Sequence, residues 1–214
     1  MSNILVIGAS GQIGKQATQK LLDAGHKVTA LVRNKDKLSD IEHSSLSIFE
    51  ENLEADFSGA FDGCDTVVFC AGSGANTGPE KTLLIDLWAA RNAVEFAKAA
   101  NIQQFVMVSS VGADNPDAID SPIKPYLVAK HMADQHLLQS GITYTILRPG
   151  SLTDEAGTEY VQEAMPESDE ERKIPREDVA TAIVYSIGAD KAYNRVYGLF
   201  TGDEPLKAVI QQTS

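Results

Sequence analysis

Apolar and polar residues follow two alternating patterns along this chain. Short apolar runs predict buried strands, and longer stretches with apolar residues every three or four positions predict helices with one buried face. The predicted strands lie near residues 3–8, 27–32, 45–49, 66–70, 104–109, 143–147 and 196–200. The predicted helices lie near 12–24, 80–100, 125–140, 177–188 and 205–212, with a weaker helical stretch at 55–61.

Regular alternation of strands and helices is typical of an α/β protein. It predicts a single-domain Rossmann fold, in which a doubly wound, mostly parallel sheet has helices on both faces. A length of 214 residues suits one domain spanning 1–214, and no linker or internal repeat divides it. The irregular segment at about 151–175 is the candidate for a small substrate-side element. It is interpreted either as a solvated, mobile loop or as a lid.

The helix predicted at 80–100 is apolar over most of its circumference. A helix of this kind is buried in its own domain or shared with another surface. Both a monomer and a homodimer therefore stay open.

Charge narrows the possible partners. The formal net charge is −12, which disfavours nucleic acid and anionic membrane as partners. Ten acidic and three basic residues between Ser151 and Asp178 account for −7 of that charge. No apolar run has the length of a membrane span and no signal-peptide pattern opens the chain, so a cytoplasmic location is expected.

The cysteines and histidines suggest no metal site. Cys64 and Cys70 lie close together near one predicted strand, and we expect them to be core thiols without a disulfide. The four histidines are scattered, and none has metal-ligand spacing to another.

A glycine-rich turn joins the first predicted strand to the first predicted helix. Gly8, Gly11 and Gly14 recur at every third position there. The first glycine permits the tight turn, the second lets backbone N–H groups approach a pyrophosphate, and the third lets the helix pack against the strand. The positive end of the helix then favours the phosphates. The turn predicts a bound dinucleotide.

The residue at the end of the second strand indicates which dinucleotide. NAD-specific sites usually have an acidic residue there to bind the ribose 2′-hydroxyl, but this chain has Arg33. A guanidinium pairs with a 2′-phosphate and stacks on adenine. We therefore expect NADP (NADPH), with NAD less favoured.

Candidate catalytic residues follow in the second half of the chain. Ser109 and Ser110 end a buried strand, at the sheet edge where ligands bind in such folds. Tyr126 and Lys130 are four residues apart, so they share one helix face. An ammonium beside a phenol favours the phenolate, which suits Tyr126 to exchange a proton with a substrate oxygen.

Together these motifs resemble the short-chain dehydrogenase/reductase superfamily. The glycine spacing and the short chain are most similar to its atypical and extended-like branches, in particular the NmrA-like NAD(P)-binding family. Further similarity lies in Asn52-Leu53, Cys70-Ala71-Gly72 and Arg148-Pro149-Gly150. The resemblance implies cofactor contacts from the following residues: Gly8, Ser10, Gly11, Gln12, Ile13, Arg33, Asn52, Leu53, Cys70, Ala71, Gly72, Ser109, Tyr126, Lys130 and Pro149.

The same resemblance implies roles in catalysis. Ser110 would hold the substrate oxygen, Tyr126 would be the general acid or base, and Lys130 would bind the nicotinamide ribose. Asp86 departs from the family pattern, because many members have an asparagine there that supports a proton relay.

We thus expect an NADP-dependent oxidoreductase or epimerase-like enzyme that acts on a small carbonyl or alcohol substrate. Only 65 residues follow Pro149, which favours small or planar substrates over large sugar nucleotides. Two alternatives stay open. One is a non-catalytic NADP(H)-sensing regulator, and the other is a reductase of flavin-like or quinone-like acceptors.

Overall fold

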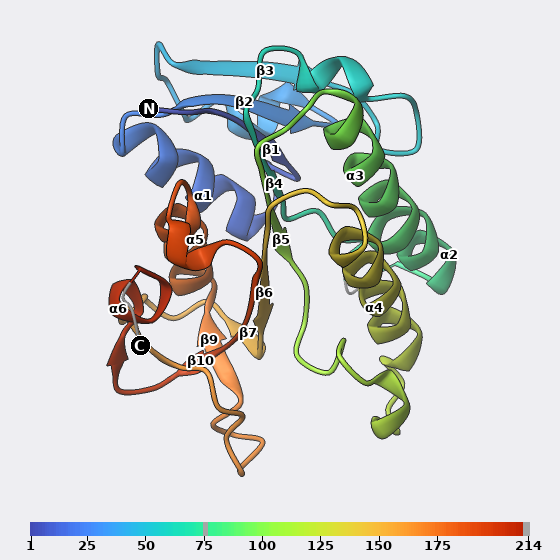
Figure 1. Cartoon of the computed structure of the whole chain (residues 1–214), viewed down its shortest axis with the longest axis vertical. Helices are drawn as coiled ribbons and strands as arrows, with labels where there is room; N and C mark the ends of the chain where they lie inside the picture. The colour runs from blue at the N-terminus through green and yellow to red at the C-terminus, as the bar shows by residue number, and fades with distance from the viewer. Residues whose placement is uncertain (75–76, 212–214) are drawn as a thin grey trace.

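The computed structural model describes residues 1–74 and 77–211 (Figure 1). A nine-stranded sheet runs through it in the order β11-β8-β10-β6-β5-β4-β1-β2-β3. All neighbouring strands from β10 to β3 pair in parallel, while β8 pairs antiparallel with β10 and β11 at the other edge. This confirms the single α/β domain with a mostly parallel sheet.

The seven predicted strands are all present, within one or two residues of their expected ends. The strands of the large sheet are β1 (Asn3–Ile7), β2 (Lys27–Val32), β3 (Leu46–Glu50), β4 (Thr66–Phe69), β5 (Gln104–Val108), β6 (Tyr144–Pro149), β8 (Tyr160–Gln162), β10 (Arg195–Thr201) and β11 (Glu204–Pro205). A separate pair is formed by β7 (Ser151–Thr153) and β9 (Lys173–Pro175).

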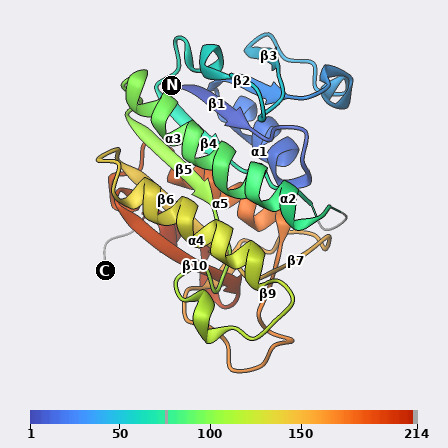
Figure 2. The same cartoon turned by 90° about the vertical axis from the view of Figure 1, so that its right-hand side faces the viewer.

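Helices cover both faces of the sheet (Figures 1 and 2). The group on one face is α1 (Gln12–Asp23), α5 (Arg176–Ser186) and α6 (Leu206–Gln211). The group on the other face is α2 (Pro79–Lys81), η3 (Thr82–Ala89), α3 (Ala90–Ala99) and α4 (Lys124–Leu138). Single-turn helices are η1 (Lys35–Leu38), η2 (Ser58–Phe61), η4 (Pro116–Ala118) and η5 (Asp190–Ala192). Residue 212 of the predicted last helix lies outside the described residues.

The strand β1 shows how the two faces share the core. Ile4 and Val6 pack in the cluster beneath α1 and α5, whereas Leu5 and Ile7 pack in the cluster beneath α3 and α4. Successive side chains of a strand point to opposite faces, so a strand with helices on both sides is apolar at every position. This explains the uninterrupted apolar run that opens the chain.

The segment 151–175 is more regular than its sequence suggested. Three short strands lie within it, and Asp178 of α5 is buried and accepts hydrogen bonds from the backbone N–H groups of Thr158 and Glu159, at 3.0 and 2.9 Å. The prediction of irregular structure was therefore wrong for these stretches. Strands of three residues are too short to show an alternating pattern, because their pairing depends on backbone groups.

The predicted helix at 80–100 changes its winding along its length. It begins at Pro79, runs as a π-helix through η3 and continues as the α-helix α3. Leu83 and Trp88 are 57% and 53% exposed, while Ala90 and Ala93 are fully buried. Burial within the domain thus explains one side of this helix. Across the described ranges, no helix is long and apolar enough to span a membrane.

We expect Gly8→Ala to destabilise the fold much more than Gly25→Ala. Both glycines have positive φ, +89° and +84°. A Cβ on Gly8 would lie 2.6 Å from the Ala71 backbone nitrogen, whereas one on Gly25 would meet no described atom within 4 Å. Backbone strain should cost each variant about 1 kcal/mol, and the clash should add roughly 1–3 kcal/mol for Gly8→Ala.

Urea unfolding of the two variants beside the natural protein measures both free energies. Gly25→Ala is the matched control, because it has the same backbone strain without the clash. Equal losses of unfolding free energy in the two variants would contradict the close approach of Gly8 to Ala71, which follows β4.

Candidate active site

The glycine turn leaves the start of α1 open to a ligand. The Gly11 N–H donates to the Gly8 carbonyl at 2.9 Å, which closes the turn after β1. Gly11 is the N-cap of α1, and within the described chain no side chain caps it and no acidic residue stands in the first helical turn. The first N–H groups of a helix without a cap are suited to a phosphate. These residues therefore fit the pyrophosphate of a dinucleotide.

The third glycine is required by helix packing. A Cβ on Gly14 would lie 2.2 Å from the Gly8 carbonyl oxygen, a distance that no side chain tolerates. Ile13 and Gly14 are buried, while Gly11 and Gln12 are exposed. The turn thus presents Gly11 and Gln12 outward and packs its later residues against β1.

Parallel pairing brings the other candidate cofactor residues to the same edge of the sheet. In the spatial order of the strands, Asn52 and Leu53 follow β3, Arg33 follows β2, and the glycine turn follows β1. The next positions along the edge belong to residues that follow β4, β5 and β6: Cys70, Ala71, Gly72, Ser109, Ser110 and the terminal Pro149 of β6. Arg33 and Asn52 are exposed, and Leu53 is buried.

Cys70 has a structural contact at this edge. Its thiol donates to the Ile7 carbonyl, with 3.3 Å between Sγ and oxygen, and burial raises its pKa to about 12. Cys70 therefore stays a neutral thiol that joins the ends of β4 and β1. Cys64 and Cys70 are both free and partly buried, as the expectation of unpaired thiols requires. In the described part of the chain, no group of His, Cys, Asp or Glu side chains is arranged to hold a metal ion.

Helix α4 positions the tyrosine and the lysine. Tyr126 is half-buried, and the Lys130 side chain is only 4% exposed. The Lys130 Nζ lies 5.9 Å from the centre of the Tyr126 ring and donates to the Val108 carbonyl at 2.9 Å. The ammonium is thus held between the end of β5 and the phenol, as the shared helix face predicted.

The charges around Lys130 oppose the effect of its burial. Burial alone would lower the pKa of Lys130, but the negative charges of Tyr126, Asp86, Asp134 and Cys70 in their ionised forms raise it above its ordinary value. Lys130 therefore keeps its positive charge in the interior.

The two serines have different environments. Ser109 is buried, and its Oγ donates to the Asp134 Oδ2 at 2.9 Å. Ser110 is half-buried, and its Oγ donates to the neighbouring Val111 carbonyl at 3.1 Å. The hydroxyl of Ser109 is buried and bonded to Asp134, so Ser110 is the serine whose side chain is partly exposed at the carboxyl edge of the sheet.

Asp134 is a site residue that the sequence interpretation missed. Its Oδ2 also accepts from the Arg148 Nε and Nη2, at 3.1 and 3.0 Å. Burial raises the pKa of Asp134, and the Arg148 charge and the Ser109 hydrogen bond oppose that rise. The contacts tie α4 to the ends of β5 and β6. The available signal was spacing, since Asp134 follows Lys130 by four residues on the same helix face.

Asp86 of η3 completes the group of buried charges. It is fully buried, its Oδ2 accepts from the Ser73 backbone N–H at 3.1 Å, and its Oδ1 lies 3.7 Å from the Lys130 Nζ. A Cβ on Gly72 would lie 3.2 Å from that Oδ1. The departure from the family pattern therefore places a carboxylate directly beside the lysine.

A second contact missed from sequence lies over the glycine turn. The Asp154 Oδ1 accepts from the Gln12 Nε2 at 3.1 Å and from the Arg176 Nη1 at 2.7 Å. The beginning of the segment 151–175 thus rests against the start of α1. Because these residues are far apart in sequence, spacing gave no signal for their contact.

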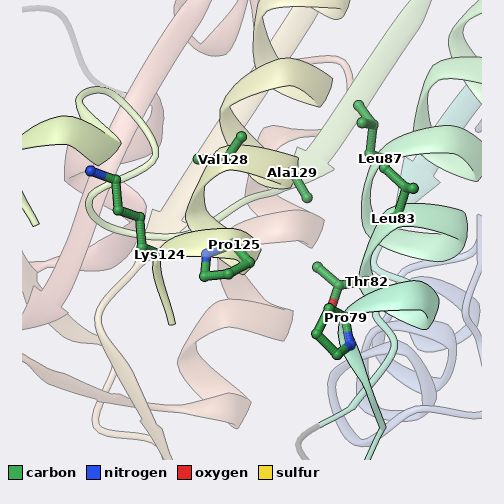
Figure 3. Close-up of a pocket in the computed structure, with 8 residues that line it drawn as sticks. All are labelled: Pro79, Thr82, Leu83, Leu87, Lys124, Pro125, Val128 and Ala129. Carbon is green, nitrogen blue, oxygen red and sulfur yellow. The ribbon is translucent and has the colours of Figure 1, made fainter. Parts of the chain in front are cut away.

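A mostly apolar cavity of about 410 Å³ opens between η3 and α4 (Figure 3). Leu83 and Leu87 form one wall, and Pro125, Val128 and Ala129 form the other. These α4 residues are sequence neighbours of Tyr126 and Lys130, but neither of those two is among the described residues that line the cavity. Pro79, Thr82 and Lys124 complete its lining.

Known proteins resemble this chain over nearly its whole length. A family described as NAD(P)H-binding matches residues 8–190. A Bacillus subtilis (strain 168) protein named an uncharacterised sugar epimerase is 40% identical over 214 residues, which are 98% of this chain and 99% of the relative. A solved Bacillus halodurans structure, titled as a proposed NAD-dependent epimerase/dehydratase, is 39% identical with a TM-score of 0.93, and the match covers 100% of both chains.

A more distant structure shares the fold alone. It is a short-chain dehydrogenase/reductase from Veillonella parvula in complex with NADP, 20% identical with a TM-score of 0.72, and the match covers 95% of each chain. The family match takes in the glycine turn, the buried Lys130 and the carboxyl ends of β2 to β6. The chain belongs to the NAD(P)H-binding family, whose Rossmann fold it shares with the short-chain dehydrogenases/reductases.

Proposed function

We propose that this protein is an NADP-dependent oxidoreductase or epimerase-like enzyme that acts on a small carbonyl or alcohol substrate. The observation that supports this most is the buried Lys130 ammonium beneath Tyr126, held by the Val108 carbonyl next to the two serines. Burying a charge is costly unless it is paired and hydrogen-bonded, and buried titratable groups cluster at functional sites. This one lies at the edge where cofactors bind in this fold.

Each side chain has a distinct proposed role. Tyr126 gives or takes the proton of the substrate oxygen, and Ser110 binds that same oxygen. Lys130 binds the nicotinamide ribose and stabilises negative charge on Tyr126. The bound nicotinamide supplies or accepts the hydride. Asp134 acts indirectly, because it holds the ends of β5 and β6 together through Ser109 and Arg148.

The preference for NADP rests on Arg33. It is exposed directly after β2, and the following turn is closed by Asn34, whose side chain accepts from the Asp36 N–H at 2.8 Å. The exposed guanidinium can meet a 2′-phosphate, and the sequence directly after β2, Arg33 to Lys35, has no carboxylate to bind a ribose hydroxyl instead.

The apolar cavity between η3 and α4 does not identify the substrate, because Ser110, Tyr126 and Lys130 are not among the described residues that line it. The Bacillus subtilis relative is named a sugar epimerase, and epimerisation would use the same proton and hydride chemistry. We favour reduction or oxidation of the smaller substrate class.

We expect Tyr126→Phe to lower NADPH-dependent turnover by a factor of about 10² or more, because general acid catalysis contributes on this scale. NADPH affinity should change little, since the proposed role of the phenol is to contact the substrate oxygen and not the cofactor phosphates. Steady-state kinetics on a panel of small aldehydes and ketones, with NADPH binding followed by fluorescence, measures both quantities. Met132→Ala, on the exposed side of α4, is the control variant.

Unchanged turnover in Tyr126→Phe with flavin or quinone acceptors would instead support hydride transfer without a protein acid. NADPH binding without turnover on any substrate would support the sensing regulator.

We expect Arg33→Ala to weaken NADPH binding by about 10- to 100-fold, the loss of a charge-assisted pair with phosphate. NADH affinity should change by less than about threefold, because NADH lacks the 2′-phosphate. Titration of the two cofactors into the natural protein and the variant measures this ratio, and NADH is the internal control. An equal loss of affinity for both cofactors would contradict the role of Arg33 in selectivity.

A further inference from the structure

Asp86 forms an ion pair with Lys130 that the proposed mechanism does not use. Its side chain is fully buried, and its Oδ1 lies 3.7 Å from the lysine Nζ. Among the described residues, this oxygen has no hydrogen-bond partner. A buried carboxylate with one unsatisfied oxygen is costly, so its presence beside the catalytic lysine needs an explanation.

The local backbone is arranged to accommodate this carboxylate. Asp86 lies in the π-helix η3, a rare geometry that is frequent at functional sites. The Ser73 N–H binds its second oxygen, and the Ser73 Oγ lies 3.3 Å from the Thr82 Oγ1, which joins the β4 end to η3 again. Gly72 has no side chain to crowd it. The carboxylate is therefore fixed in place beside Lys130.

Counting charges around Lys130 shows what the carboxylate changes. The groups that face the lysine are Asp86 from η3, Tyr126 and Asp134 from α4, and Cys70 after β4, and Arg148 of β6 pairs with Asp134. With the phenol and the thiol protonated, the two carboxylates balance the two cations, and the group is neutral. Without Asp86 it would carry a charge of +1, nearest to Tyr126.

We propose that Asp86 is a positioning residue that fixes Lys130 and offsets part of its charge, so that Lys130 stabilises a Tyr126 anion less than a lone ammonium would and the site favours reduction of a carbonyl substrate. This proposal rests on the proposed function for the role of Tyr126. A lone ammonium would favour the phenolate, which abstracts protons. A neutral pair leaves the phenol protonated, and a protonated phenol donates.

The chemistry that follows is balanced. The carbonyl carbon gains a hydride from the reduced nicotinamide cofactor, and the carbonyl oxygen gains the Tyr126 proton. The C=O π bond is replaced by one C–H and one O–H bond, so the substrate is reduced to an alcohol while NADPH is oxidised to NADP⁺. The tyrosine anion is then reprotonated from solvent. The substrate class is therefore an aldehyde or a ketone.

The test is an ultraviolet titration of phenolate absorbance. The chain has six tyrosines, so the contribution of Tyr126 is obtained as the difference from Tyr126→Phe. In the natural protein this difference gives the reference midpoint. The same difference is then measured between Asp86→Asn and the double variant Asp86→Asn/Tyr126→Phe. The midpoint of the Tyr126 titration should be lower there by about one pH unit, since a nearby charge typically shifts such a titration by 1–3 units. Glu95→Gln is the matched control, because it removes an exposed acidic charge from the same run of helix and should leave the midpoint unchanged.

Kinetics give a second readout. Asp86→Asn should raise alcohol oxidation at pH 7 relative to carbonyl reduction by about tenfold, as its pH–rate profile moves toward acid. An unmoved midpoint in Asp86→Asn would overturn the proposal. If Asp86→Asn does not fold, the midpoint of the Tyr126 titration is measured in Asp86→Ser instead and compared with that of the natural protein.

The two proposals fail in different ways. Full turnover in Tyr126→Phe would remove the proposed function. Lost turnover in that variant, with no change in the Asp86→Asn titration, would remove only the role of Asp86.

Discussion

Two strands that run in the same direction cannot be joined by a tight turn, so each parallel pair of the central sheet needs a crossover connection. These crossovers place helices on both faces and return every strand with its carboxyl end at one edge. The glycine turn, Arg33 and the two serines share that edge for this reason. β1 and β4 are neighbours although β2 and β3 lie between them in sequence, and the connections therefore leave in opposite directions there. Ligands bind at such switch points in open α/β sheets.

A group of buried charges lies at this edge of the sheet. A lysine in the interior must be paired, and its partners must be paired in turn. Here the Val108 carbonyl and Asp86 hold Lys130, while Arg148 and Ser109 hold Asp134. One oxygen of each carboxylate, Oδ1 of Asp86 and Oδ1 of Asp134, accepts no hydrogen bond from residues 1–74 and 77–211. Such a network specifies one arrangement of α4 against β5 and β6, because any shift would leave further charges unpaired.

Local signals explain what the sequence could predict. The strands and main helices have continuous or periodic apolar patterns, and Tyr126 and Lys130 are linked by helix spacing, so their arrangement followed from the chain itself. Asp154 meets Gln12 and Arg176 only after the chain has folded, and the strands at 151–153, 160–162 and 173–175 depend on backbone pairing. The sequence Ser109-Ser110 also did not show which hydroxyl points into the interior. Ser109 does so because it donates a hydrogen bond to Asp134, which lies on α4.

A protein with a net charge of −12 must still bind an anionic cofactor, and the distribution of its acids shows how. The start of α1 has no acid in its first turn, and Arg33 lies exposed at the next strand end. Asp154, the carboxylate over the glycine turn, is paired with Arg176. The Gly157 N–H is the main cause that lowers the pKa of Glu177, followed by Lys20. Much of the local acidity therefore serves as hydrogen-bond acceptors that anchor the segment 151–175 to α1 and α5. Because these charges are paired in place, they repel the phosphates less than their number suggests.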